Sequence, residues 1–309
     1  MPFIRNYLKT MLMMNMLLTS VMAQASPVTC FNTNMGNFCM ELLEKHAPKT
    51  VANFLNYINS GAYVQSIFHR SEPGFVIQGG GFKATSLNNE VQISAVNTFD
   101  PVANEFGLSN TRGMVAMAKL GNDPDSATSQ WFVNLSDNSE APAFLDSQNG
   151  GFTVFAKIIF DGMTVFDAIE DLQRVNFGGP LSSTPAINFD PSQSFQIENF
   201  VLINALELHD VTGIFNDKVL SFAVKSGENS FFDVRLVLIA VKPNIVFELD
   251  KTSVSSLSTV STTNMATFSA QDRTLLIPSV MVNETTIVNN VKLSLTNPAN
   301  FQFTLVNFE

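Results

Sequence analysis

FHRSEPGFVIQGGGF, residues 68–82, places a histidine, an arginine, a glutamate and a proline among aromatic residues and four glycines. The stretch does not fit a phosphate-binding loop, because Gly79–Gly81 is followed by FKATS, without the lysine and hydroxyl pattern of such loops. A metal site needs several ligands, yet the three histidines, at positions 46, 69 and 209, form no spaced pair. The chain also lacks the G-x-S-x-G turn around a serine nucleophile. Close backbone approach, or a bulge, explains the glycine run better.

The same stretch sets one strong hydrogen-bond donor, Arg70, beside the apolar residues Phe75 and Val76 and the amide of Gln78. His69 could act as a general base, but a lone histidine between Phe and Arg in a strand is more often structural. An arginine facing an apolar cleft can orient and polarise an amide without covalent chemistry. Rotation about an X-Pro amide has a barrier of about 18–20 kcal/mol and needs neither a nucleophile nor a metal. The stretch is therefore suited to hold a proline ring and stabilise a twisted amide.

FHRSEPGFVIQGG resembles the signature of the cyclophilins, the cyclosporin-binding class of peptidyl-prolyl isomerases. Further segments are similar to the family's first helix, central strand, S-x-x-S-Q-F-F-I segment, following strand with second helix, and closing strand: APKTVANFLNYINSGAY (47–63), NTRGMVAMAK (110–119), SATSQWFVNLSDN (126–138), FTVFAKIIFDGMTVFDAI (152–169) and NFVLINALEL (199–208). The resemblance runs from Val28 to Asp210 in the family's order. It implies a mainly β fold, an eight-stranded antiparallel barrel capped by two helices.

Carried over position by position, the resemblance implies catalytic roles for Arg70, Phe75 and Gln78. Arg70 would donate hydrogen bonds to the carbonyl or amide region of the proline, and Gln78 would orient substrate and arginine. The substrate-binding positions would be Val76, Ala118, Lys119, Gln130, Phe132, Phe144, Leu145 and Phe152. Of these, Phe132 and Leu145 would hold the proline ring together with Phe75, and Val76 stands where many members have methionine. The expected partners are proline-containing polypeptides, and no metal or organic cofactor is predicted.

Three positions depart from the family's usual pattern. Phe144 stands where cyclosporin-sensitive members carry tryptophan, and Phe152 stands where many eukaryotic members carry histidine. Both changes resemble bacterial members, so we expect weak cyclosporin binding and retained isomerase activity. Trp131 replaces another aromatic residue beside Phe132, and we expect it to point to the opposite face of its strand.

The composition and the N-terminus bear on partners and location. The formal net charge is −10, which argues against nucleic-acid binding, because phosphate contacts need clustered Lys and Arg. Arg5 and Lys9 precede the apolar stretch MLMMNMLLTSVM (11–22) and Ala23-Gln24-Ala25, a pattern typical of a signal peptide over residues 1–25. An N-terminal anchor or a buried helix is the alternative. We expect export to the bacterial periplasm or beyond, with no stable membrane insertion after cleavage.

Cys30 and Cys39 flank the sequence FNTNMGNF, in which Asn34, Met35 and Gly36 look like a hairpin turn. In a hairpin centred there, the two cysteines would face each other near disulfide range. An oxidising compartment would favour the bond. The alternative is a pair of buried free thiols.

The chain beyond residue 210 has a different character, with little helix signal and many Thr, Ser, Asn and Val residues. Within residues 211–309, two segments, about 215–249 and 268–305, align with offsets of mostly 56 or 57 residues, although alternating strands also align by chance. We therefore predict a signal peptide (1–25), an isomerase domain (26–210) and a small all-β, sandwich-like module of two related units (211–309).

The leading interpretation is an exported peptidyl-prolyl cis-trans isomerase that assists the folding of exported proteins. The alternative is a chaperone that binds proline-containing segments, or a surface-interaction protein, whose β-rich tail sets the target.

Overall fold

The computed structural model describes residues 27–88, 90–227, 230–257 and 265–309. The predicted signal peptide, residues 1–25, lies outside these ranges. Within them, none of the helices is both long and apolar enough to cross a membrane.

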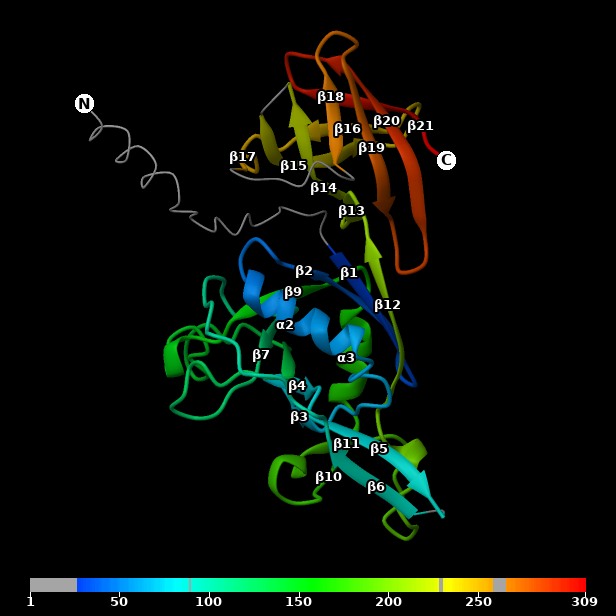
Figure 1. Cartoon of the computed structure of the whole chain (residues 1–309). Helices are drawn as coiled ribbons and strands as arrows, with labels where there is room; N and C mark the ends of the chain where they lie inside the picture. Colours follow the sequence, from blue (N-terminus) through cyan, green and yellow to red (C-terminus); the bar gives the residue numbers. More distant parts are fainter. Residues whose placement is uncertain (1–26, 89, 228–229, 258–264) are drawn as a thin grey trace, which may run out of the picture.

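The first sheet forms the antiparallel barrel expected from the sequence (Figure 1). Its strands, in spatial order, are β12 (Ile203–Asp210), β1 (Pro27–Thr33), β2 (Gly36–Leu42), β9 (Val154–Ile159), β7 (Met114–Met117), β8 (Trp131–Asn134), β4 (Val76–Gly79) and β3 (Arg70–Glu72). The ends of this order meet through backbone hydrogen bonds, in which Gln65 N donates to Ile203 O (2.7 Å) and Phe68 N to Val201 O (3.1 Å). The predicted eight-stranded antiparallel barrel is confirmed.

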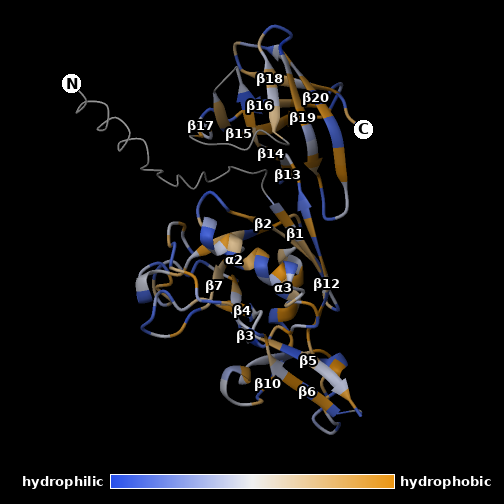
Figure 2. Ribbon diagram, in the orientation of Figure 1, coloured by the Kyte–Doolittle hydropathy of each residue, from blue (hydrophilic) through white to orange (hydrophobic). Residues whose placement is uncertain are grey.

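Helices α2 (Pro48–Asn59) and α3 (Met163–Glu170) pack against the barrel. Pro48 occupies the first turn of α2, where a missing N–H costs nothing, and Ser60 ends the helix. Both helices carry hydrophobic and hydrophilic residues on different faces (Figure 2). Helix α3 ends at Glu170, one residue past the segment 152–169 that resembles the family's second helix, and Gln173 already belongs to strand β10.

The barrel interior is filled by aromatic side chains. The Trp131 ring is fully buried and lies 5.8 Å from the Phe31 ring and 5.6 Å from the Phe68 ring, centroid to centroid. Helix α2 adds Phe54, whose ring meets Trp131 edge-on at 6.4 Å. Trp131 points into this core while Phe132 belongs to a separate apolar cluster, so the two residues face opposite sides of β8.

Several shorter elements surround the barrel: the hairpin β5 (Phe82–Leu87) and β6 (Glu90–Ala95), the hairpin β10 (Gln173–Val175) and β11 (Thr184–Ala186), and the 3-10 turns at Gln148–Gly150, Gly179–Leu181 and Ile197–Asn199. The β5–β6 hairpin extends away from the barrel as a two-stranded arm (Figure 1). The sequence analysis did not predict this arm.

The second sheet is an all-β module made of β13 (Gly213–Asn216), β14 (Val219–Ser226), β15 (Phe231–Ala240), β16 (Val246–Leu249), β17 (Ser255–Ser256), β18 (Ala266–Ser269), β19 (Thr274–Met281), β20 (Ile287–Asn297) and β21 (Gln302–Asn307). Its pairings run β14-β18-β19-β20-β21-β16-β15 and return to β14, so the sheet closes into a ring around its own core. The predicted additional β module is confirmed.

Strands β13–β16 and β18–β21 have equivalent pairings. In this equivalence β13 corresponds to β18 and β14 to β19. The pairing of β13 with β19 therefore corresponds to the pairing of β18 with β14. Phe247 and Phe303, which lie at equivalent positions, pair directly across β16 and β21. The ring of Phe215 packs edge-on against Phe247 at 5.9 Å, and that of Phe268 against Phe303 at 6.1 Å. The module therefore has an approximate internal two-fold axis between β16 and β21.

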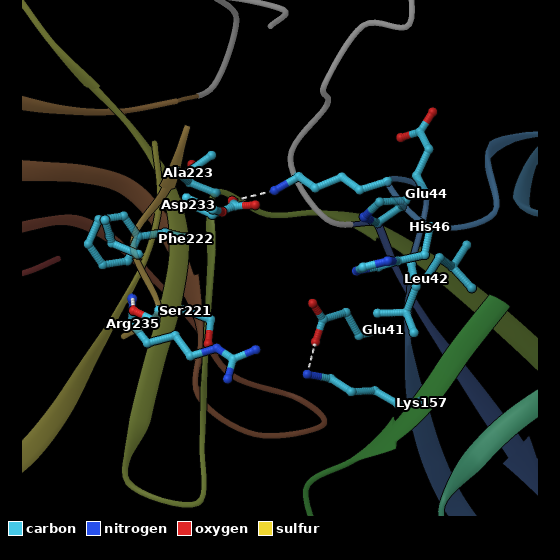
Figure 3. Close-up of a pocket in the computed structure, with 17 residues that line it drawn as sticks. Glu41, Leu42, Glu44, His46, Lys157, Ser221, Phe222, Ala223, Asp233 and Arg235 are labelled. Atoms are coloured by element: carbon cyan, nitrogen blue, oxygen red, sulfur yellow. Dashed lines mark hydrogen bonds and ion pairs between the residues drawn. The ribbon is translucent and has the colours of Figure 1, made fainter. Parts of the chain in front are cut away.

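The module sits on one end of the barrel, next to the β1–β2 hairpin. Cys30 and Cys39 are direct cross-strand partners, as the hairpin predicts, and they form a disulfide with an S–S distance of 1.99 Å. Cys39 packs with Ile214 and Met281 of the module in a small apolar cluster. Beside this contact a cleft of about 240 Å³ separates the two sheets, and an ion pair of Lys45 with Asp233 bridges it (Figure 3).

Candidate active site

Three strands align the central residues of the site. Arg70 on β3 pairs with Gln78 on β4, and Gln78 pairs with Phe132 on β8. Because directly paired residues point to the same face of a sheet, the three side chains leave the barrel together. The next strand continues the row, since Ala116 on β7 pairs with Phe132. The register thus gathers residues that are up to 62 positions apart in sequence.

The guanidinium of Arg70 is held from two sides and remains accessible. Its Nε lies 3.3 Å from Oε1 of Glu72, and its Cζ lies 5.8 Å from the centre of the Phe75 ring. The Arg70 side chain is 35% exposed. Arginine carries five N–H donors in a rigid fork, so Glu72 leaves most of them for another acceptor. Glu72 is the ionic partner of Arg70 among the described residues.

An apolar cluster adjoins the arginine and is separate from the main core. Its buried members are Val76, Ala116, Phe132, Leu145 and Val154, and its partly buried members include Phe75, Ala118 and Phe152. The Phe152 ring meets Phe132 edge-on at a centroid distance of 5.8 Å. A partly open apolar cluster beside a charged donor can hold a small ring while presenting its amide to the donor.

Gln130 fixes the position of Gln78. Gln78 Nε2 donates to Gln130 Oε1 at 2.7 Å, and the backbone of Gln130 accepts a 2.9 Å hydrogen bond from Ala118 N. Because the N–H of Ala118 is already bonded to Gln130, a peptide that paired with Ala118 would use the carbonyl of Ala118 instead of its N–H. A Cβ on Gly81 would lie 2.8 Å from Gln130 Cδ, and one on Gly80 would lie 2.5 Å from Ser129 O. This close approach explains the glycine run.

The remaining predicted residues lie on the rim. Lys119 Nζ donates to the carbonyl oxygens of Asn149 (2.8 Å) and Gly151 (2.7 Å) and lies 4.8 Å from the centre of the Phe152 ring. Partial burial lowers the pKa of Lys119, and the charge of Asp125 opposes that shift. Lys119 thus fastens the loop that carries Phe152.

Phe144 differs from its neighbour Leu145. The Phe144 side chain is 49% exposed and its backbone has a φ of +53°, whereas Leu145 is buried in the apolar cluster. A positive φ is uncommon for a bulky residue and turns the chain so that adjacent side chains point apart. Phe144 is therefore available to a bound chain at the rim.

A buried amide network that the sequence analysis missed supports the pocket. Asn138 Nδ2 donates to Phe75 O (2.9 Å) and to Asn134 Oδ1 (2.8 Å), and Leu145 N donates to Asn138 O (2.9 Å). Asn110 Nδ2 donates to Phe152 O at 3.0 Å. Asn110, Asn134 and Asn138 are all buried. The network links the backbones of three apolar pocket residues, so it fixes their spacing.

His69 lies beneath the site. Burial first and the positive charge of Arg70 second lower its pKa to about 4, against the opposing effect of hydrogen bonds to the Ile67 backbone and the Gln130 side chain. The His69 ring packs edge-on against Phe82 at a centroid distance of 4.9 Å. A neutral, buried imidazole at physiological pH fits the structural interpretation of this histidine.

The amino-acid sequence of this part of the chain is similar to those of known proteins. A family model described as cyclophilin type peptidyl-prolyl cis-trans isomerase/CLD matches residues 28–190. Peptidyl-prolyl cis-trans isomerase A of Dickeya dadantii is 41% identical over 168 residues, which cover 53% of this chain and 81% of that protein. Peptidyl-prolyl cis-trans isomerase B of Escherichia coli is 43% identical over 143 residues, covering 45% of this chain and 82% of that protein. A crystal structure of a Cryptosporidium parvum cyclophilin type isomerase, determined in the presence of the dipeptide Ala-Pro, has 25% identity, a TM-score of 0.41, and covers 59% of this chain and 98% of its own.

Proposed function

The chain belongs to the cyclophilin-type peptidyl-prolyl cis-trans isomerases, and we propose that Arg70 and the apolar cluster beside it carry its rotation of X-Pro bonds. The observation that supports this proposal is the row of Arg70, Gln78 and Phe132 across three paired strands. The row sets a charged donor and a hydrophobic side chain on the same face of the sheet, so a proline ring held at Phe132 would present its amide on the side of Arg70.

The proposed mechanism is non-covalent. Phe132 and Leu145 hold the pyrrolidine ring, so the residue before the proline rotates against a fixed ring. As the amide twists, its nitrogen loses conjugation with the carbonyl and regains a lone pair, which can accept a hydrogen bond. A donor from Arg70 to that nitrogen is stronger in the twisted state than in either planar state, and this difference lowers the barrier.

Glu72 and Gln78 would act as positioning residues for this donor. The ion pair of Glu72 with Nε, at 3.3 Å, would orient the fork of the Arg70 guanidinium. Gln78 is held by Gln130 and lies directly opposite Arg70, within the row that faces the substrate. The ion pair restricts Arg70, and the hydrogen bond to Gln130 restricts Gln78, before substrate arrives, so less entropy is lost in the transition state.

The test is the cis-to-trans rate of a short Ala-Pro-Phe peptide with the chain from Ser26 and its Arg70→Ala variant. We expect the variant to lose about a hundredfold or more in kcat/KM, the usual effect of removing one preorganised donor. Arg70→Lys keeps the charge but not the fork and should recover only part of the rate. Arg235→Ala, an exposed arginine in the module, serves as the matched control. Equal rates for the wild type and a folded Arg70→Ala variant would remove the arginine from the mechanism.

We also propose that the enzyme assists the folding of exported proteins. The apolar stretch at residues 11–22, the Ala23-Gln24-Ala25 pattern and the Cys30–Cys39 disulfide support export. Mass spectrometry of protein from the periplasmic fraction of a bacterial host should find a chain beginning at Ser26. If Arg70→Ala abolishes peptide turnover but leaves the refolding yield of a proline-rich client unchanged, the chaperone alternative replaces the catalytic one.

A further inference from the structure

The C-terminal module contains a cavity that is lined almost entirely by hydrocarbon. It has a volume of about 330 Å³ and is lined by residues from all seven strands of the ring, β14, β18, β19, β20, β21, β16 and β15, and from the loops beside them. Five phenylalanines form much of its wall: Phe222, Phe232, Phe268, Phe301 and Phe303. Among the described residues of the lining, none has a charged side chain and Ser226 is the polar member. Such a surface offers dispersion and hydrophobic contacts but almost no hydrogen bonds.

The floor and the mouth of the cavity differ in exposure. Leu236 and Leu275 at the floor are buried, whereas Val254 and Phe301 at the mouth are 41% and 43% exposed. The cavity is therefore open to solvent at one end. The mouth of a β-barrel is a common place for a small-molecule site, and such sites are mostly apolar. When a ligand displaces water from the hydrophobic side chains of an open cavity, the burial of their apolar surface makes binding more favourable.

The volume and shape set the class of ligand. An apolar cavity of about 150 Å³ accepts benzene, so a cavity about twice that size has room for roughly ten to twelve carbon atoms. The ammonium of Lys251 lies 5.3 Å from the centre of the Phe301 ring, at the mouth. The neighbouring carboxylate of Asp250 accepts hydrogen bonds from N (3.0 Å) and Oγ1 (2.6 Å) of Thr252, so its charge is directed to its own turn. A cation thus stands at the entrance of a hydrocarbon-lined cavity.

We infer that the C-terminal module binds an aliphatic chain of about ten carbons with an anionic head group, the chain inside the ring and the head beside Lys251. The site lies on a different sheet from Arg70, so the inference does not depend on the isomerase mechanism. A medium-length fatty acid has this chemistry.

The test is calorimetric titration of the chain from Ser26 with hexanoate, octanoate, decanoate and dodecanoate, each below its micelle concentration. We expect one molecule of decanoate per chain. Affinity should rise roughly threefold to fourfold per added methylene group and level off near ten carbons, when the cavity is full. Affinity that keeps rising through dodecanoate, or a stoichiometry above one, would indicate adsorption to the surface and overturn the inference.

Two variants fill the cavity from different walls. Val224→Phe and Leu295→Trp should each weaken decanoate binding at least tenfold while leaving turnover of the Ala-Pro-Phe peptide unchanged. Unchanged binding in a folded variant would place the ligand elsewhere and contradict the inference. If both variants lose the unfolding transition of the module, the chain-length series on the unaltered protein decides alone, together with the rise in melting temperature that a ligand specific for the folded state must cause.

The head group is tested separately. Lys251→Gln should weaken decanoate binding severalfold but leave decanol binding unchanged, because the neutral alcohol does not use the charge. Lys242→Gln, an exposed lysine that does not line the cavity, is the matched control and should alter neither. An equal effect of both lysine variants would remove the anionic head from the inference. A short apolar peptide is also tested as a competitor of decanoate in the same titration. If the peptide displaced decanoate at a concentration below the dissociation constant of decanoate, the ligand of the cavity would be a polypeptide side chain and not a fatty acid.

Discussion

The barrel encloses Trp131, Phe31 and Phe68, which are almost completely buried, whereas the ring of the C-terminal module leaves Phe232 and Phe301 partly open around a cavity. Both are closed arrangements of strands, antiparallel in the barrel and with one parallel pair, β14 with β18, in the ring, and both are rich in phenylalanine. In the barrel the interior is occupied by its own side chains, so the candidate active site had to form on an outer face, at Arg70 and Phe132. In the module the interior itself remains available. Closure of a sheet thus fixes which hydrophobic side chains point inward but not whether they fill the interior.

The largest effect should come from emptying the filled interior. Trp131→Ala removes the ring that Phe31, Phe54 and Phe68 all contact, so the free energy of unfolding of the barrel should fall by about 3–5 kcal/mol. Urea denaturation followed by circular dichroism measures the change. A loss below about 1 kcal/mol would mean that the barrel interior tolerates a cavity as the module does, and the contrast would fail.

The next effect is the pH dependence of stability that follows from His69, whose buried imidazole stays uncharged in the folded barrel. Above pH 6.5 His69 is neutral in the folded and the unfolded chain and contributes no pH dependence. As the pH falls from 6.5 to 4, the unfolded chain takes up a proton that the folded chain does not, because its folded pKa is lowered to about 4. The barrel should therefore lose about 3 kcal/mol of stability over this range.

Denaturation midpoints between pH 7 and pH 4 measure this loss. His69→Gln should remove it, and His46→Gln, an exposed histidine, should keep it. The same slope in both variants would assign the pH dependence to other groups.

A smaller effect is expected at the amide network behind the proline pocket. Asn138→Ala removes the donor to Oδ1 of Asn134 and one of two hydrogen bonds to Phe75 O, which costs about 1–3 kcal/mol. Because the network spaces the pocket residues, kcat/KM for the peptide should fall more than the folded fraction does. Asn149→Ala, whose exposed side chain donates to Leu120 O, is the comparison. A stable Asn138→Ala variant with full activity would show that packing alone shapes the pocket.

The smallest effect should be seen at the open end of the module. Phe301→Ala truncates a ring that is 43% exposed and already borders a cavity, so we expect a stability change of under about 1 kcal/mol. Thermal unfolding followed by circular dichroism provides the measurement. A loss comparable to that of Trp131→Ala would mean that the module is packed as tightly as the barrel.

Local sequence patterns predicted the parts of the molecule whose information is itself local. The hairpin turn at Asn34–Gly36 set Cys30 opposite Cys39, and the segment 47–63, similar to the family's first helix, contains α2. Arg70 and Gln78 lie together in one strand-turn-strand segment, whereas Phe132 was named through the resemblance to the cyclophilins. The catalytic roles of these residues stay predictions.

Features that depend on distant partners could not be read in this way. Asn110, Asn134 and Asn138 look like ordinary polar residues near strand ends, and only the fold buries them against one another. The β5–β6 arm has a short alternation, in which Val91 and Ile93 are half-buried between exposed polar residues, but these side chains meet their partners Ile67 and Phe200 only in the fold. The ring of the module depends on the pairing of β14 with β15 and β18, which sequence alternation alone does not specify.

The pairing of Phe247 with Phe303 has a consequence for the origin of the module. Val246 pairs with Thr304 and Glu248 with Gln302. Because Gln302 is the counterpart of Val246 and Thr304 that of Glu248, the axis exchanges these two pairs. A contact of this kind is self-complementary, the property that allows two identical chains to form a symmetric dimer. A single four-stranded unit could therefore have associated with a second copy through the edge that now joins β16 to β21. Gene duplication and fusion would then have made that dimer permanent within one chain and freed its two halves to diverge.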